Sequence, residues 1–102
     1  MTIDTGTLES ALAVAVGHDP DLVAELRRAF VGSVDRQVDL LRRSRCDANW
    51  QYTALRLKGL ATSFDHIGLM KLAEEAYACA PGDPVVLRKL TSLLQDLSPS
   101  AG

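Results

Sequence analysis

Residues 50–64 read W-Q-Y-T-A-L-R-L-K-G-L-A-T-S-F and show a regular helical pattern. The apolar positions step by four, three, four and three residues, a spacing that places side chains along one side of an α-helix. These positions are Trp50, Ala54, Leu57, Ala61 and Phe64. We therefore expect a helix over about residues 48–64, with Asp47 as its N-cap and this stripe packed into a core.

The opposite side of the same helix is unusual in composition. Leu55 lies more than a quarter turn from the apolar stripe, and Gln51, Gly59 and Thr62 lie close by on the same side. A glycine in a helix interior costs about 1 kcal/mol relative to alanine. Such a cost indicates that something approaches the backbone closely at Gly59. The outward side therefore combines an apolar residue with a position open to close approach.

Helical spacing continues on both sides of this segment. Further helices are expected over about residues 5–16, 20–43, 68–80 and 84–97. Asp19 with Pro20, and Asp83 with Pro84, have the order of an N-cap followed by a first helical residue. The helix over 20–43 is expected to turn one broad face to the core, made by Leu22, Leu26, Ala29, Phe30, Ser33, Val34, Gln37, Leu40 and Leu41.

Length and composition favour one small helical domain. The chain has 102 residues and a mass of 11.0 kDa, of which 5% are aromatic and 47% are apolar. We expect a single all-α domain over residues 1–102: an antiparallel four-helix bundle with its core at about 20–97 and a short additional N-terminal helix at about 5–16.

Charge and hydropathy exclude several classes of partner. The net charge of −2 predicts neither nucleic-acid binding nor attraction to an anionic membrane. No apolar run approaches the roughly 20 residues that span a bilayer, and the start of the chain lacks the pattern of a signal peptide. We therefore expect a cytoplasmic protein.

No residue pattern indicates an enzyme. His18 and His66 stand alone at predicted helix starts and are interpreted as surface or capping residues. Cys46 and Cys79 form neither a disulfide framework, a metal site nor a recognisable catalytic motif. The glycines are scattered and make no phosphate-binding loop. We expect no metal and no cofactor.

Residues 54–59, A-L-R-L-K-G, resemble the signature A-H-x-L-K-G of histidine-containing phosphotransfer (HPt) domains, which act in two-component phosphorelays. Ala54, Leu57, Lys58 and Gly59 match, and Leu55 occupies the position of the phospho-accepting histidine. P-D-L-V-A-E-L-R-R-A-F at 20–30 is similar to the preceding helix of the family. L-A-T-S-F at 60–64 and G-L-M-K-L-A-E-E-A at 68–76 are similar to the segments that follow. The resemblance covers about residues 20–97.

The resemblance implies a bundle of the HPt type and a docking role. In this family a helix presents an exposed imidazole, and a partner receiver domain supplies the aspartate and the magnesium ion for phosphoryl transfer. Lys58 and Gly59 take the places of the cation and the small residue beside the phosphate. Leucine has no nucleophilic atom, so Leu55 accepts no phosphate and no catalytic residue is assigned.

Three explanations of Leu55 remain open. In the first, the chain docks on a response-regulator receiver or a histidine kinase without accepting phosphate. In the second, His66 or His18 is the acceptor. In the third, Leu55 was introduced by substitution. The expected docking surface consists of Gln51, Tyr52, Leu55, Arg56, Lys58, Gly59 and Thr62.

Two readings compete with docking. A single exposed leucine is normal on protein surfaces. A helical adaptor or dimerisation bundle outside phosphorelays also remains an alternative. Within the HPt reading, a monomer is favoured over a dimer.

Overall fold

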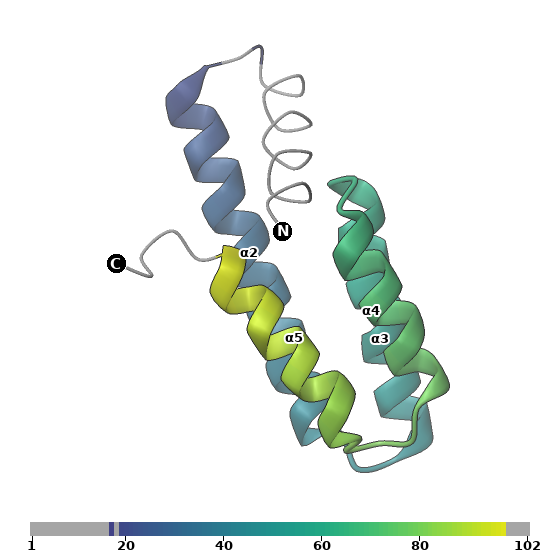
Figure 1. Cartoon of the computed structure of the whole chain (residues 1–102). Coiled ribbons are helices and arrows are strands. Elements are labelled where there is room, and N and C mark those ends of the chain that lie inside the picture. Colours follow the sequence, from purple (N-terminus) through teal and green to yellow (C-terminus); the bar gives the residue numbers. More distant parts are fainter. Residues whose placement is uncertain (1–16, 18, 98–102) are drawn as a thin grey trace.

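The computed structural model describes Gly17 and residues 19–97, and this part consists of α-helices joined by short connections, with no β-strand (Figure 1). The predicted helix at 5–16 and His18 lie outside the described residues. The helices are α2 (Pro20–Arg43), α3 (Asp47–Ser63), α4 (Ile67–Ala78) and α5 (Pro84–Leu97).

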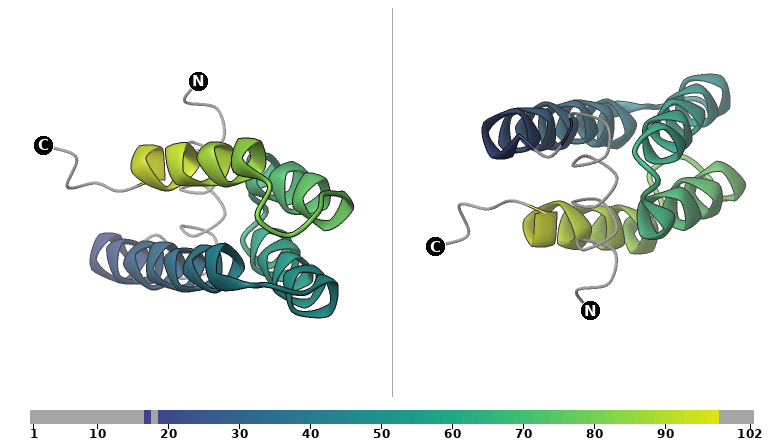
Figure 2. Two further views of the ribbon diagram at one scale, coloured as in Figure 1. Left: turned by 90° about the horizontal axis from the view of Figure 1, so that it is seen from below. Right: turned by 90° about the horizontal axis from the view of Figure 1, so that it is seen from above.

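Short connections join the four helices, and successive helices run in opposite directions (Figure 1). Each helix packs against the next one along the chain, and α5 also packs against α2. Views from the two ends show α2 beside α5, and α3 beside α4 (Figure 2). The helices therefore enclose one core, and α3 is held between α2 and α4.

Two of the predicted N-caps are confirmed. Asp19 accepts hydrogen bonds from the backbone N–H groups of Asp21 and Leu22, at 3.0 and 3.4 Å. Asp83 accepts from the N–H groups of Val85 and Val86, at 2.9 and 3.2 Å. These backbone hydrogen bonds, that of Val86 above all, lower the pKa of the Asp83 carboxyl, so the cap is charged at neutral pH.

The predicted cap of α3 is wrong. Asp47 is the first residue inside the helix, where its carboxylate lies near the positive end of the helix dipole. Cys46 is the N-cap and makes no side-chain hydrogen bond to the first turn. Helix α4 begins at Ile67, one residue before the prediction, because His66 caps it, and ends at Ala78, two residues early.

The core consists of apolar side chains from all four helices, each at most 1% exposed. The prediction for α2 is correct for Phe30, Val34 and Leu41, but it also includes residues that are exposed. Ala29 is one of them. Leu22 and Leu40 are 46% and 45% exposed. Val38 is buried although the predicted face did not include it. The buried positions of α2 are Phe30, Val34, Val38 and Leu41.

Trp50 fixes α3 against α4. Its ring is fully buried, and its indole N–H donates to the backbone carbonyl of Ala76 over 2.6 Å. The same carbonyl accepts from the N–H of Cys79, at the end of α4. One side chain on α3 therefore contacts the backbone of α4 directly, and this contact sets which side of α3 faces inward.

Replacing Trp50 with phenylalanine tests this contact. We expect Trp50→Phe to lower the free energy of unfolding by about 1–3 kcal/mol, because it removes the hydrogen bond and leaves unfilled space in the core. Urea unfolding followed by circular dichroism measures the change. Tyr52→Phe, at a site that is 62% exposed, is the control and should change the value by less than about 0.5 kcal/mol. Equal effects of the two variants would contradict the role given to Trp50.

Candidate functional site

The predicted division of α3 into an inner and an outer side is confirmed by burial. Trp50, Ala54, Leu57 and Ala61 are fully buried. We call the opposite side the outer face of α3. It contains the seven residues of the expected docking surface, of which Lys58 is half-buried at the margin and the others are exposed: Gln51, Tyr52, Leu55, Arg56, Lys58, Gly59 and Thr62.

Two large apolar side chains stand on the outer face. Leu55 is 52% exposed and Tyr52 is 62% exposed. Arg56, one turn after Tyr52, donates to the Tyr52 hydroxyl at 3.2 Å and lies over its ring, with the guanidinium carbon 5.7 Å from the ring centre. Tyr52 and Arg56 therefore form a pair, while Leu55 beside them offers a purely apolar surface.

Lys58, the cation expected beside a phosphate, is directed toward α4. Its Nζ atom lies 3.1 Å from Oε2 of Glu74. Both side chains are about half exposed, at 44% and 52%, and exposed pairs of this kind contribute about 0–1 kcal/mol. The charge of Lys58 is thus balanced by Glu74 in this structure, and the ion pair is weak enough for Lys58 to leave it for another anion.

Gly59 meets no other part of the described chain. A Cβ atom built on it would have no heavy atom within 4 Å outside its own helix and neighbours. The expectation that something approaches this backbone closely is therefore not met by any described residue. The sequence thus places a helix-destabilising residue at an open surface position.

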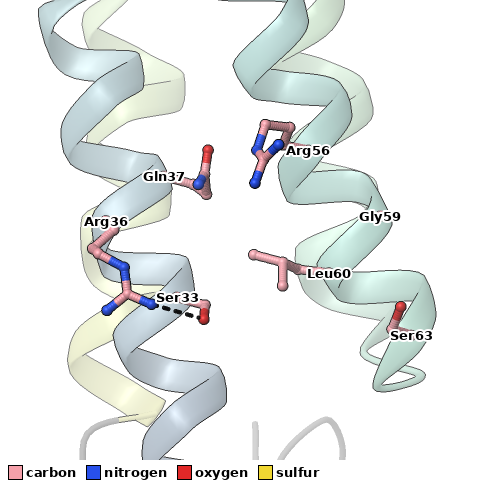
Figure 3. A pocket seen from close by; sticks show the side chains of 7 residues that line it. All are labelled: Ser33, Arg36, Gln37, Arg56, Gly59, Leu60 and Ser63. Atoms are coloured by element: carbon pink, nitrogen blue, oxygen red, sulfur yellow. Dashed lines mark hydrogen bonds between the residues drawn. The ribbon is translucent and has the colours of Figure 1, made fainter.

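The open space beside Gly59 belongs to a groove between α2 and α3 (Figure 3). The groove has a volume of about 410 Å³. In Figure 3, Gln37 and Arg56 point toward each other across it, and Leu60 extends from α3 toward α2. The residues that line it are Ser33, Arg36, Gln37, Arg56, Gly59, Leu60 and Ser63.

Sequence reasoning missed the α2 side of this groove. The sequence pattern predicts Ser33 and Gln37 on the core-facing side of the helix and gives Arg36 no role. In the structure Ser33 and Gln37 are only half-buried, and Arg36 is exposed. Two polar residues on an otherwise apolar face were the available signal for a groove.

His66 is a capping residue, as expected, but it is not on the surface. The imidazole is fully buried, its Nδ1 atom accepts from the N–H of Leu69 at 3.0 Å, and its ring stacks near Phe30, with 6.1 Å between ring centres. Because a phosphate acceptor must reach a partner's active site, this arrangement argues against His66 as the acceptor. It also places His66 away from the outer face, in the connection between α3 and α4.

The two cysteines are free thiols. Cys46 is exposed and Cys79 is half-buried, and neither forms a disulfide. Burial, followed by the negative charge of Asp83, raises the pKa of the Cys79 thiol, which keeps it protonated rather than nucleophilic. Among residues 17 and 19–97, no group of three or more His, Cys, Asp or Glu side chains is placed to hold a metal ion.

Comparisons of the chain with family models, with curated proteins and with solved structures found no match. Within the described residues, no helix combines the length and the apolar character needed to cross a bilayer. The interpretation of the outer face therefore depends on its own geometry and on the residues at 54–59.

Replacing Gly59 with alanine tests whether its surroundings are open. We expect Gly59→Ala to raise the free energy of unfolding by about 0.5–1 kcal/mol, because alanine favours the helix and its methyl group meets no neighbour. Gly32→Ala is the matched control: it lies inside α2, where a Cβ atom would make an ordinary contact of 3.7 Å with Arg36. Thermal and urea unfolding measure both variants. Destabilisation by Gly59→Ala alone would show that another segment or a second chain contacts this position.

Proposed function

We propose that this chain is a signalling module of the HPt type that docks on a receiver or histidine-kinase domain and does not itself accept phosphate. The observation that carries the proposal is the position of Leu55. It is exposed on the outer face of α3, at the place of the acceptor histidine in the A-L-R-L-K-G motif, and the open Gly59 follows one turn later.

The surroundings of Leu55 favour docking by apolar contact. Fully burying a leucine side chain that was exposed contributes about 1.5–3 kcal/mol. Tyr52 adds an aromatic surface beside it, and aromatic residues and arginine are enriched at protein interfaces. Gly59 has no side chain, so a partner's backbone can come close to the helix at this position. These features form a compact apolar contact that needs no phosphoryl group.

The chemistry of Leu55 excludes the family reaction at this position. Transfer from a phosphoaspartate needs a lone pair on the acceptor atom, which the imidazole nitrogen has and the leucine side chain lacks. Lys58 is paired with Glu74 rather than turned toward Leu55. The proposed module therefore keeps the contact surface of an HPt domain without its acceptor.

Restoring the histidine tests whether the scaffold is of the HPt type. We expect Leu55→His to take up phosphate from phosphorylated receiver domains of the same organism, in the presence of Mg²⁺, while the native chain stays unlabelled. Radiolabelled receivers with gel separation measure the transfer, and acid lability with base stability of the label identifies phosphohistidine. Val85→His, at an exposed apolar position on α5, is the matched control and should stay unlabelled.

Each other outcome of this assay counts against part of the proposal. Labelling of the native chain would mean that another residue is the acceptor. Labelling of both histidine variants would mean that transfer does not depend on the outer face of α3. Failure of Leu55→His to accept phosphate from any receiver would favour an adaptor or dimerisation bundle outside phosphorelays.

Binding can be tested separately from transfer. We expect Leu55→Glu to weaken binding to a receiver or kinase domain at least about tenfold, equal to about 1.4 kcal/mol, because a charged group replaces the apolar contact. Val85→Glu introduces the same charge at a position that is 46% exposed on another helix, and it should leave the affinity within about twofold. Isothermal titration calorimetry measures both. Equal affinities of the two variants would place docking elsewhere.

A further inference from the structure

The groove between α2 and α3 concentrates positive charge. Arg36 on α2 and Arg56 on α3 both line it, and its lining contains no aspartate or glutamate. Asp35 precedes Arg36 in the sequence but lines a different hollow of the surface. Two cations that face one space without a counter-charge repel each other and favour an anion between them.

Neither arginine forms an ion pair within residues 19–97. Arg36 donates to the hydroxyl of Ser33 at 3.1 Å, and Arg56 donates to the hydroxyl of Tyr52 at 3.2 Å. These contacts use a small part of the five N–H donors on each guanidinium. Elsewhere on the surface, cations do lie against carboxylates: Arg42, Arg43, Lys58 and Lys89.

The groove also contains an uncharged side-chain atom without a hydrogen-bond partner, on Gln37, and an open position at Gly59. The side-chain oxygen of Gln37 is buried and has no hydrogen-bond partner in the described structure. Its amide can turn either its NH₂ or its carbonyl toward an occupant. The Ser63 hydroxyl lines the same space, and at Gly59 no side chain narrows it. The groove thus offers hydrogen-bonding groups from both helices around an open position.

We propose that this groove binds a phosphate-type oxyanion, as inorganic phosphate or as a phosphate monoester. A phosphate ester carries a charge of about −1.5 to −2 at neutral pH, which balances two guanidinium groups, whereas one carboxylate balances only one. Guanidinium forks match phosphate oxygens in pairs, and hydroxyl and amide groups supply further hydrogen bonds. The site is separate from the Leu55 position, and it stands whether or not the chain docks on a phosphorelay protein.

A titration of the full chain tests the proposal. Two-dimensional ¹H–¹⁵N NMR spectra are recorded at pH 7.5 with increasing inorganic phosphate, at an ionic strength held constant with chloride. We expect saturable shifts of the Ser33 and Gly59 amides and of the Gln37 side-chain NH₂. Arg36→Gln and Arg56→Gln should each weaken binding at least about fivefold. Arg45→Gln, an exposed arginine outside the groove, is the matched control and should change affinity by less than about twofold.

Other probes separate the ligand classes. Acetate, a carboxylate, should bind at least about fivefold more weakly than phosphate. An N-acetylated phosphoserine amide that binds more tightly than inorganic phosphate would indicate a phosphorylated side chain as the source, and equal binding would indicate the free ion. Because all three arginines are exposed, their variants should keep the dispersed spectrum of the native fold.

Three results would overturn the proposal. The first is a set of shifts that do not saturate. The second is equal weakening by Arg45→Gln and by the two groove variants, which would indicate attraction to surface charge in general. The third is binding of acetate as tight as that of phosphate.

Discussion

The hydrogen bond from the Trp50 indole to the Ala76 carbonyl is the contact on which the arrangement of α3 depends. It sits in a fully buried site and joins the two helices that share the most extensive contact. Because α-helices turn by about 100° per residue, fixing Trp50 inward places Leu55 about 140° around the helix, on the solvent side. A buried contact near the start of α3 thus determines which side chains in the middle of the helix are exposed to solvent.

Local signals made part of this structure predictable. The stripe through Ala54 and Leu57 gives the orientation of α3, and the two Asp-Pro pairs give the starts of α2 and α5, since each signal lies within one helix. Which residues of α2 are buried could not be predicted from such local signals, because burial depends on the neighbouring helix. With 24 residues against 14 in α5, α2 extends beyond this neighbour, which leaves Leu22 exposed although it lies on an apolar face (Figure 1).

The two candidate sites also differ in how far the sequence could predict them. The outer face is formed by one helix, so helical spacing placed Gln51, Leu55, Gly59 and Thr62 together, and the resemblance at 54–59 supplied the rest of the expected docking surface. The groove needs residues from α2 and α3 at once, and which ones meet depends on how the two helices pack. Spacing along the chain does not contain that information. Two sequence signals pointed toward it. One was the polar pair Ser33 and Gln37 on an otherwise apolar face of α2, and the other was Gly59, since a glycine inside a helix indicates a close approach to its backbone.

Gly59 lies on both the outer face and the groove, so the two proposed sites are neighbours on α3. Their electrostatics nevertheless differ. Beside Leu55 the charge of Lys58 is balanced by Glu74, and Arg56 lies over the ring of Tyr52, so Leu55 and Tyr52 form the apolar part of the surface offered to a protein. Arg56 borders both surfaces, and an anion that drew it away from Tyr52 would change the aromatic edge beside Leu55. A ligand in the groove would in this way alter the surface on which a partner docks, and binding at the two places would be coupled with the same free energy in both directions.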